Sequence, residues 1–253
     1  MRYRVLLFDL FGTLVHFKPM LGPPPGRDGG ARSIEWLRGP VQEQLPRVSF
    51  DDFLVALLEV SRGIVETRPP EYCEVESHVR FRRTLERLGL RGGRTGEIAA
   101  HLCRAHMDHL AGQTEMPPSH GELLRRLAAG YRLGLISNFD HGPTAHSILV
   151  REGIASLFDV TLISADFGRR KPHPSIFAEA VQRLGEDRTA TLFVGDTIAE
   201  DVRGARAAAI DVVWINRKGE GTPHDEPQPT YTIGCLRELE RILVQEPSPR
   251  TEV

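Results

Sequence analysis

Polar side chains follow three short apolar runs of the chain, at points where a strand would end. Asp9 comes directly after the run VLLF, and Asp196 comes one glycine after the run TLFV. Ser137 and Asn138 follow the run RLGLI. Runs this short and apolar are typical of strands buried on both faces of a sheet. Since open α/β sheets bind ligands at the carboxyl ends of their strands, the three positions predict one polar site.

The residue types at these positions indicate the chemistry. Asp9 and Asp196 would repel each other across the site, and a divalent cation removes that repulsion; an all-oxygen site of this kind suits Mg²⁺. Lys171 can reach the same edge and, with the Ser137 hydroxyl, would hold an anionic group. Further carboxylates nearby are Glu200 and Asp201. Taken alone, Asp9 is as well explained by a turn cap as by catalysis.

Strands and helices alternate in the second half of the chain, which predicts a doubly wound, Rossmann-like parallel sheet. Its strands are expected at residues 5–8, 132–136, 160–163, 191–194, 212–215 and, at the edge, 231–233. In the segment 31–110, apolar residues recur at helical spacing and never alternate as in a strand. This segment is therefore predicted to be an all-helical insert. Its helices are expected to begin near Ser33, at Ser49 as an N-cap, at Tyr72 and at Glu97.

These patterns divide the chain. Residues 1–18 and 115–246 are predicted to form the α/β core, and residues 19–114 an inserted helical cap domain. The stretch PMLGPPPGRDGG at residues 19–30 is too rich in proline and glycine for regular structure. Residues 247–253 are expected to form a flexible tail.

Bulk properties exclude several classes of protein. The formal charge is −2, so no basic excess points to nucleic acid or to an anionic membrane. The three cysteines are scattered and form no disulfide framework, which suits a reducing cytoplasm. No apolar segment approaches the length of a membrane span. We expect a cytoplasmic monomer or homodimer that acts on a small molecule.

Four segments, taken together, resemble a known family. FDLFGTL, ISN, KPHPSIF and VGDTIAEDVRGA are similar to the four motifs of the haloacid dehalogenase-like (HAD) hydrolase superfamily, in order and in the right strand contexts. The helical insert after the first motif resembles the C1-type cap of that family. The resemblance implies a Rossmann-like core, a covalent intermediate on an aspartate and, in the phosphatases of the family, Mg²⁺.

The resemblance also implies roles for individual residues. Asp9 corresponds to the nucleophile, and Ser137 to the residue that binds the transferred group. Lys171 would neutralise charge between Asp9 and the transferred group. The implied metal ligands are Asp9, the backbone carbonyl of Phe11, Asp196 and, in support of its water shell, Asp201. Asn138 and Thr13 join the implied substrate-binding set, and the Thr13 hydroxyl is expected to fix the turn around the nucleophile.

One position departs from the phosphatase pattern. Phosphatases of the family carry a second Asp two residues after the nucleophile, where it protonates the leaving oxygen and later activates water. Here that residue is Phe11, which transfers no proton. General acid–base help is typically worth about 10²–10⁴-fold, or roughly 3–5 kcal/mol of barrier. Phosphoryl transfer would then be slow, or would use a leaving group that needs no proton.

The departure leaves three interpretations open. The first is a Mg²⁺-dependent phosphatase, favoured by Asp196 and Asp201 in the fourth motif. The second is a 2-haloacid dehalogenase, which lacks the second Asp, needs no metal and uses an arginine at the cap entrance; the loosely placed candidates are Arg32 and Arg38. The third is a non-catalytic relative. A phosphonatase-like use of a cap lysine is disfavoured, because only Lys18 lies near the insert.

Several histidines are weaker candidates. His106 and His109, with His101 before them, have helical spacing that could hold a metal, but without a third ligand we interpret them as a partly exposed helix face. His141, just beyond the second motif, is a further candidate for contact with substrate.

Overall fold

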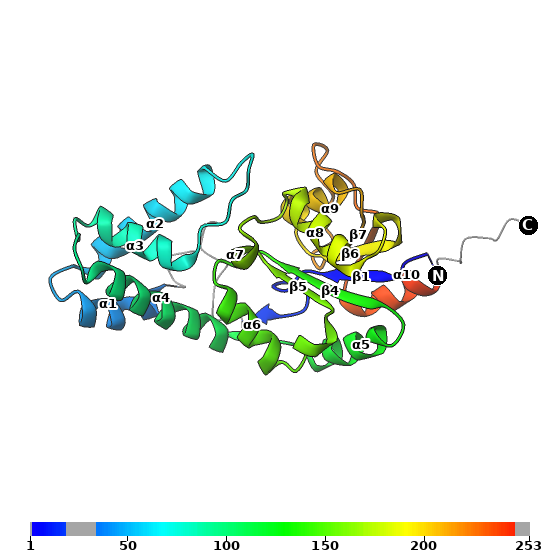
Figure 1. The fold of residues 1–253 in the computed structure, drawn as a ribbon, viewed down its shortest axis with the longest axis horizontal. Coiled ribbons are helices and arrows are strands. Elements are labelled where there is room, and N and C mark those ends of the chain that lie inside the picture. Colours follow the sequence, from blue (N-terminus) through cyan, green and yellow to red (C-terminus); the bar gives the residue numbers. More distant parts are fainter. Residues whose placement is uncertain (1, 19–33, 246–253) are drawn as a thin grey trace, which may run out of the picture. The chain divides into compact units, whose positions relative to one another are not determined.

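The computed structural model describes residues 2–18 and 34–245 and divides into two compact units. The first unit comprises Met1–His16 and Glu115–Val253, and the second comprises Phe17–Thr114 (Figure 1). The chain passes between them within two short strands, β2 (His16–Phe17) and β3 (Thr114–Glu115). The predicted loop at residues 19–30 and the predicted tail at residues 247–253 lie outside the described residues.

The first unit is built on a six-stranded, wholly parallel sheet with the order β5-β4-β1-β6-β7-β8. This order confirms the predicted doubly wound α/β fold. The strands are β1 (Val5–Phe8), β4 (Arg132–Ser137), β5 (Val160–Ile163), β6 (Thr191–Gly195), β7 (Asp211–Ile215) and β8 (Tyr231–Ile233). The predicted edge strand is therefore present.

Strand β1 lies in the middle of the sheet because each of its side chains is apolar. Val5 and Leu7 point to one face and Leu6 and Phe8 to the other, and all four are completely buried. One face packs on α8 (Pro174–Leu184) and α9 (Arg203–Ala207), which Figure 1 shows above the sheet. The remaining helices of this unit are α5 (Pro118–Ala128), α6 (Gly142–Arg151), α7 (Ser164–Phe167) and α10 (Leu239–Gln245).

The register of three adjacent strands places the predicted site residues at one edge. Phe8 of β1 is paired with Leu135 of β4 and with Val194 of β6. Asp9 therefore follows by one residue, and Ser137 and Asp196 by two. This is the carboxyl edge of the sheet, where the sequence predicts them to meet.

The second unit is helical within its described residues. Its helices are α1 (Arg38–Gln44), α2 (Phe50–Glu66), α3 (Ser77–Arg87) and α4 (Thr95–Gly112). Ser49 caps α2 as predicted, since its hydroxyl accepts a hydrogen bond from the Asp52 amide at 3.1 Å. The helix predicted to begin at Tyr72 begins instead at Ser77, because Tyr72 has a φ of +48° that no α-helix accommodates.

An aromatic cluster fills the interior of this unit. The Trp36 ring stacks on His109, with centroids 4.3 Å apart, and lies parallel to His106 at 5.7 Å. Phe81 meets His106 edge to face. The expectation of an exposed face is therefore wrong for His106, which is 5% exposed, because Trp36 and Phe81 cover it. Within the part of the chain that is described, no helix is both long and apolar enough to cross a bilayer.

Burial of His106 predicts a pH dependence of stability. Burial, together with the nearby Arg80 and His109, lowers the pKa of His106 to about 3. Below about pH 6.5 the unfolded chain binds a proton there that the folded chain does not, so stability falls as the pH falls from 6.5 toward 3. The loss approaches about 1.4 kcal/mol per pH unit.

Urea unfolding of His106→Gln at several pH values between 4 and 7 tests this point. We expect the variant to lose much of this slope, whatever its stability at pH 7. His109→Gln serves as the matched control, and its slope should change less, because His109 is far less buried. Equal slopes in the wild type and His106→Gln would contradict the assignment.

Candidate active site

A single lysine lies between two carboxylates at the carboxyl edge of the sheet. Lys171 Nζ donates hydrogen bonds to Asp9 Oδ1 and to Asp201 Oδ1, each at 2.6 Å. Lys171 and Asp201 are each only 1% exposed, and Asp9 is buried as well. Asp9 follows β1, Lys171 follows α7, and Asp201 lies in a π-helical turn, Ile198–Val202. Three segments far apart in sequence therefore meet through one ammonium group.

The charges in this cluster do not balance. Burial raises the pKa of Asp9 well above its ordinary value, against the pull of Lys171, and Asp201 and Asp196 raise it further. Burial also raises the pKa of Asp196 to about 6, with a contribution from Asp201. For Lys171 the burial penalty is outweighed by the two carboxylates, which raise its pKa. When all three carboxyl groups are ionised, the single buried ammonium group and the nearby Arg217 leave an excess of negative charge.

The excess charge and the donor atoms fit a divalent cation. Oxygen atoms of Asp9, Asp196 and Asp201 lie within 4.8 Å of one another. Mg²⁺ prefers carboxylate, carbonyl and water oxygens, and it commonly uses one or two carboxylates together with the phosphate of a substrate. The donor set at this edge is thus of the chemical type that such an ion requires.

The loop after β6 is held by hydrogen bonds to Asp201 and Trp214. Asp201 Oδ2 accepts hydrogen bonds from the Asp196 amide at 3.1 Å and the Thr197 amide at 2.9 Å. The Trp214 indole donates to the Asp196 carbonyl at 3.0 Å. Insertion of a π-helical turn is common at functional sites, and here the turn carries Asp201. Asp201 therefore orients both Lys171 and the backbone that carries Asp196.

The turn after Asp9 approaches Asp196 closely. Gly12 has a φ of +90°, and a Cβ at this position would lie 2.3 Å from Asp196 Oδ2. The Gly12 amide donates to the Val15 carbonyl at 2.8 Å, and Arg217 Nη1 donates to the Gly12 carbonyl at 2.5 Å. Glycine is therefore required here both for its backbone conformation and for the space beside the carboxylate.

The Asn138 side chain hydrogen bonds to the backbone of Lys171. Its side-chain nitrogen donates to the Lys171 carbonyl at 3.0 Å, and its side-chain oxygen accepts from the Lys171 amide at 2.8 Å. This pair of hydrogen bonds links the end of β4 to the backbone of Lys171. Asn138 therefore fixes the segment from which the ammonium group reaches Asp9.

The hydroxyls of Ser137 and Thr13 are fully buried, and within the described residues neither has a hydrogen-bond partner. The expectation that the Thr13 hydroxyl fixes the turn is wrong, because backbone hydrogen bonds from Leu14 and Val15 to the Leu10 carbonyl do so. Buried hydroxyls without partners carry a desolvation cost, which a ligand oxygen would relieve.

Phe11 contacts another aromatic ring at the same edge. Its ring centroid lies 4.7 Å from that of Phe139, with the planes 32° apart. Phe139 comes directly after Asn138, so the two rings belong to the loops that follow the adjacent strands β1 and β4. Phe139, Trp214 and Arg217 were not predicted as site residues, because each acts through a contact that only the folded chain creates.

The other candidate residues that the structure describes make contacts outside the Lys171 cluster. Arg38 pairs with Glu35 at 2.6 Å in the second unit, while Arg32 lies outside the described residues. Lys18 donates to the Gly112 carbonyl at 3.1 Å. Glu200 lies 3.5 Å from Arg170, and His141 Nδ1 is 2.9 Å from the Thr144 hydroxyl.

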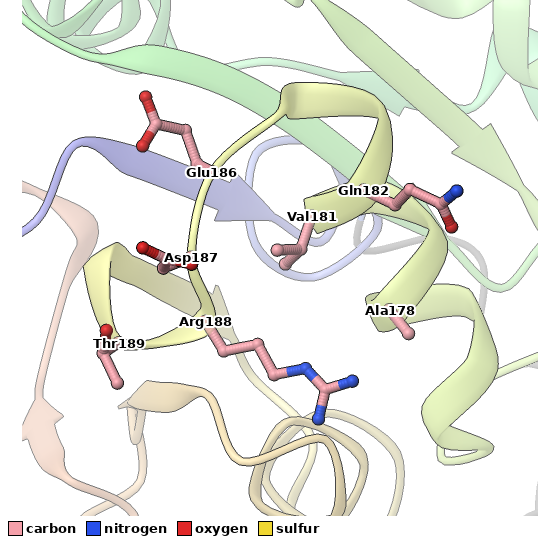
Figure 2. Close-up of a pocket in the computed structure, with 7 residues that line it drawn as sticks. All are labelled: Ala178, Val181, Gln182, Glu186, Asp187, Arg188 and Thr189. Atoms are coloured by element: carbon pink, nitrogen blue, oxygen red, sulfur yellow. The ribbon is translucent and has the colours of Figure 1, made fainter.

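A hollow of about 460 Å³ lies elsewhere on the first unit (Figure 2). Its lining residues come from α8 and from the loop that precedes β6, namely Ala178, Val181, Gln182, Glu186, Asp187, Arg188 and Thr189. The loop enters β6 at its amino end, whereas Asp196 follows the carboxyl end, a strand length of about 16 Å away. Glu186 is already paired with Arg4. This hollow is therefore separate from the carboxylate cluster.

Comparisons with known proteins point to one family. Residues 3–209 match the family model described as a haloacid dehalogenase-like hydrolase. The chain is 30% identical to the pyrimidine 5'-nucleotidase YjjG of Escherichia coli over 66% of this chain and 70% of that protein. It is 31% identical to a phosphoserine phosphatase of Thermus thermophilus, over 63% of this chain and 61% of that one.

A solved structure, a 2-haloacid dehalogenase from Pseudomonas syringae pv. Tomato DC3000, is similar over 96% of this chain and 99% of its own. The TM-score is 0.73 and the sequence identity 24%. At this level of identity the likeness is one of fold.

The contact between Gly12 and Asp196 leads to a prediction about stability. We expect Gly12→Ala to destabilise the protein by more than the roughly 1–2 kcal/mol that a left-handed backbone costs an L-residue, because the new methyl group also displaces the Asp196 carboxylate. Gly219→Ala is the matched control: Gly219 has a φ of +66°, and its Cβ would meet nothing within 4 Å. Urea unfolding of both variants measures the difference. Equal losses would mean that the turn does not press on Asp196.

Proposed function

This chain belongs to the haloacid dehalogenase-like hydrolase family, and on that premise we propose that it is a Mg²⁺-dependent phosphatase of small phosphorylated compounds. The observation that carries the proposal is the buried cluster in which Lys171 joins Asp9 to Asp201, with Asp196 beside them. Two of the similar proteins are a nucleotidase and a phosphatase, which supports a phosphate ester as substrate.

The proposed metal ligands are Asp9, Asp196 and the backbone carbonyl of Phe11, with Asp201 in support. Their oxygen chemistry and the excess negative charge favour Mg²⁺ over softer metals. When bound, the ion would neutralise charge on the phosphate group. Because Gly12 has no Cβ, the two loops that carry these ligands can approach each other closely.

In the proposed reaction the Asp9 carboxylate attacks phosphorus, and the bond from phosphorus to the leaving oxygen breaks. Lys171 stabilises the charge on Asp9 and on the transferred group, because its ammonium group already lies 2.6 Å from Asp9 Oδ1. The buried hydroxyls of Ser137 and Thr13, which have no hydrogen-bond partner among the described residues, donate hydrogen bonds to phosphate oxygens. Asn138 keeps Lys171 in place. Water then attacks the phosphoryl group and restores the carboxylate.

A second candidate function is hydrolysis of a 2-haloacid. Phe11 favours it, since a halide leaves without a proton. Against it stands Asp196, a carboxylate that a metal-free reaction does not need and whose burial carries a cost. We place the phosphatase first, because holding this half-buried carboxylate close to two buried ones is best explained by a cation.

Replacement of Asp196 tests the role of the metal. We expect Asp196→Asn to reduce phosphatase turnover at least about 10²-fold, since it removes a carboxylate ligand and costs several kcal/mol of charge stabilisation. EDTA should have the same effect on the wild type, and added Mg²⁺ should reverse it. Asp187→Asn, which changes an exposed carboxylate far from the cluster, is the control and should behave as the wild type.

Chloride release from 2-chloropropionate distinguishes the two candidate functions. We expect no chloride above background, with or without EDTA. Turnover of phosphate esters that persists undiminished in EDTA, or metal-independent release of chloride, would favour the dehalogenase instead. Inactivity in both assays would favour a non-catalytic relative.

A further inference from the structure

The side chain that hydrogen bonds to Asp9 is a lysine, and the side chain two residues after Asp9 is a phenyl ring; neither is suited to protonate a leaving oxygen. Phe11 and Phe139 form a pair of phenyl rings on the loops that follow β1 and β4, the loops that also carry Asp9 and Asn138. A phenyl ring neither gives nor takes a proton. The loops that carry Asp9 and Asn138 therefore also carry two apolar rings in contact with each other.

The polar neighbours of Asp9 do not supply a proton either. On the proposed function, Asp196 and Asp201 support the cation and are held as carboxylates, which have no proton to give. Among residues 2–18 and 34–245, Lys171 is the side chain that hydrogen bonds to the Asp9 carboxylate, and it is shared with Asp201 at the same distance of 2.6 Å. Held between two anions, the ammonium group keeps its proton. Ser137 and Thr13 carry alcohol hydroxyls, which are far too weak as acids at neutral pH.

We propose that this site is specialised for phosphates whose leaving oxygen is stable as an anion, namely aryl and acyl phosphates, and that release of phosphate from Asp9 is its slow step. This inference rests on the proposed phosphatase function. In the first half, a bond forms from Asp9 oxygen to phosphorus, the bond from phosphorus to the leaving oxygen breaks, and the electron pair departs with a phenolate or carboxylate.

The acidity of the leaving group decides which substrates can react in this way. A phenol has a pKa of about 10 and a carboxylic acid one of about 4, so both leave as anions without help. An alkyl alcohol is comparable to water, whose pKa is about 15.7, and its alkoxide needs a proton as it leaves. Without a general acid, alkyl phosphates lose a factor of about 10²–10⁴.

In the second half of the reaction, the choice of substrate cannot make up for the missing general acid–base group. Water must attack phosphorus, the bond from phosphorus to Asp9 oxygen breaks, and the proton of water ends on the released phosphate. No choice of substrate makes that water more acidic. Phosphorylated Asp9 is therefore expected to accumulate, with a burst of leaving group followed by slow turnover.

A series of substrates tests both halves on the full-length protein with Mg²⁺ present. The series is 4-nitrophenyl phosphate, phenyl phosphate, acetyl phosphate and glycerol 3-phosphate, which separates aryl, acyl and alkyl leaving groups. We expect kcat/KM to rise steeply with leaving-group acidity, and 4-nitrophenyl phosphate to give a burst equal to the enzyme concentration.

Substitutions at the ring pair refine the test. Phe11→Asp should raise the rate with glycerol 3-phosphate by about 10²-fold or more and flatten the dependence on the leaving group. Phe11→Leu is the matched control, because it remains apolar and should keep the steep dependence. If Phe11→Asp fails to fold, the wild-type series still decides the question.

Three results would overturn the inference. Equal rates for alkyl and aryl phosphates in the wild type would reveal a general acid elsewhere, and loss of the alkyl rate in His141→Gln would identify it. A steep dependence without a burst would overturn the slow second step. No phosphate release from any substrate would overturn the proposed function itself, which distinguishes that failure from the other two.

Discussion

The architecture of this site depends on one buried ammonium group. Lys171 is surrounded by protein, and burial of a lone charge costs several kcal/mol unless anions compensate it. Asp9 and Asp201 provide that compensation at 2.6 Å, and they lie far apart along the chain. The sheet brings them together because β1 lies between β4 and β6. Removal of either anion would take away one of the two hydrogen bonds that hold the ammonium group, so the fold and the placement of the nucleophile depend on the same contacts.

The carboxylates that compensate the charge of Lys171 repel a third carboxylate nearby. A third carboxylate, Asp196, lies within 4.8 Å of the other two, and its loop is fastened by the Trp214 indole and by Asp201. The protein thus uses hydrogen bonds to hold a repulsive group in place. A cation would compensate this repulsion, which is why we propose Mg²⁺ at this edge. On the proposed function, the apolar pair of Phe11 and Phe139 at the same edge would favour substrates whose leaving group needs no proton.

Much of the fold could be predicted from the sequence because its signals are local. Strand β1 is four apolar residues ended by an acid, and parallel topology brings such ends together. The signal for the helix cap at Ser49 is equally local, because its hydroxyl bonds to an amide only three residues away. The contacts that complete the site are not local: Trp214 reaches Asp196 from another strand, and the burial of His106 depends on rings from α3 and from the segment before α1. Helical spacing predicts a face, but not what covers it.

The proposed chemistry requires that Asp9 accepts the phosphoryl group. Peptide mass spectrometry after an acid quench of the protein with 4-nitrophenyl phosphate and Mg²⁺ measures this directly. We predict a phosphoryl group on the peptide that contains Asp9 in the wild type and an unmodified peptide in Asp9→Asn. Phosphate release from the wild type while the mass of that peptide stays unchanged at every quench time would contradict a covalent role for Asp9.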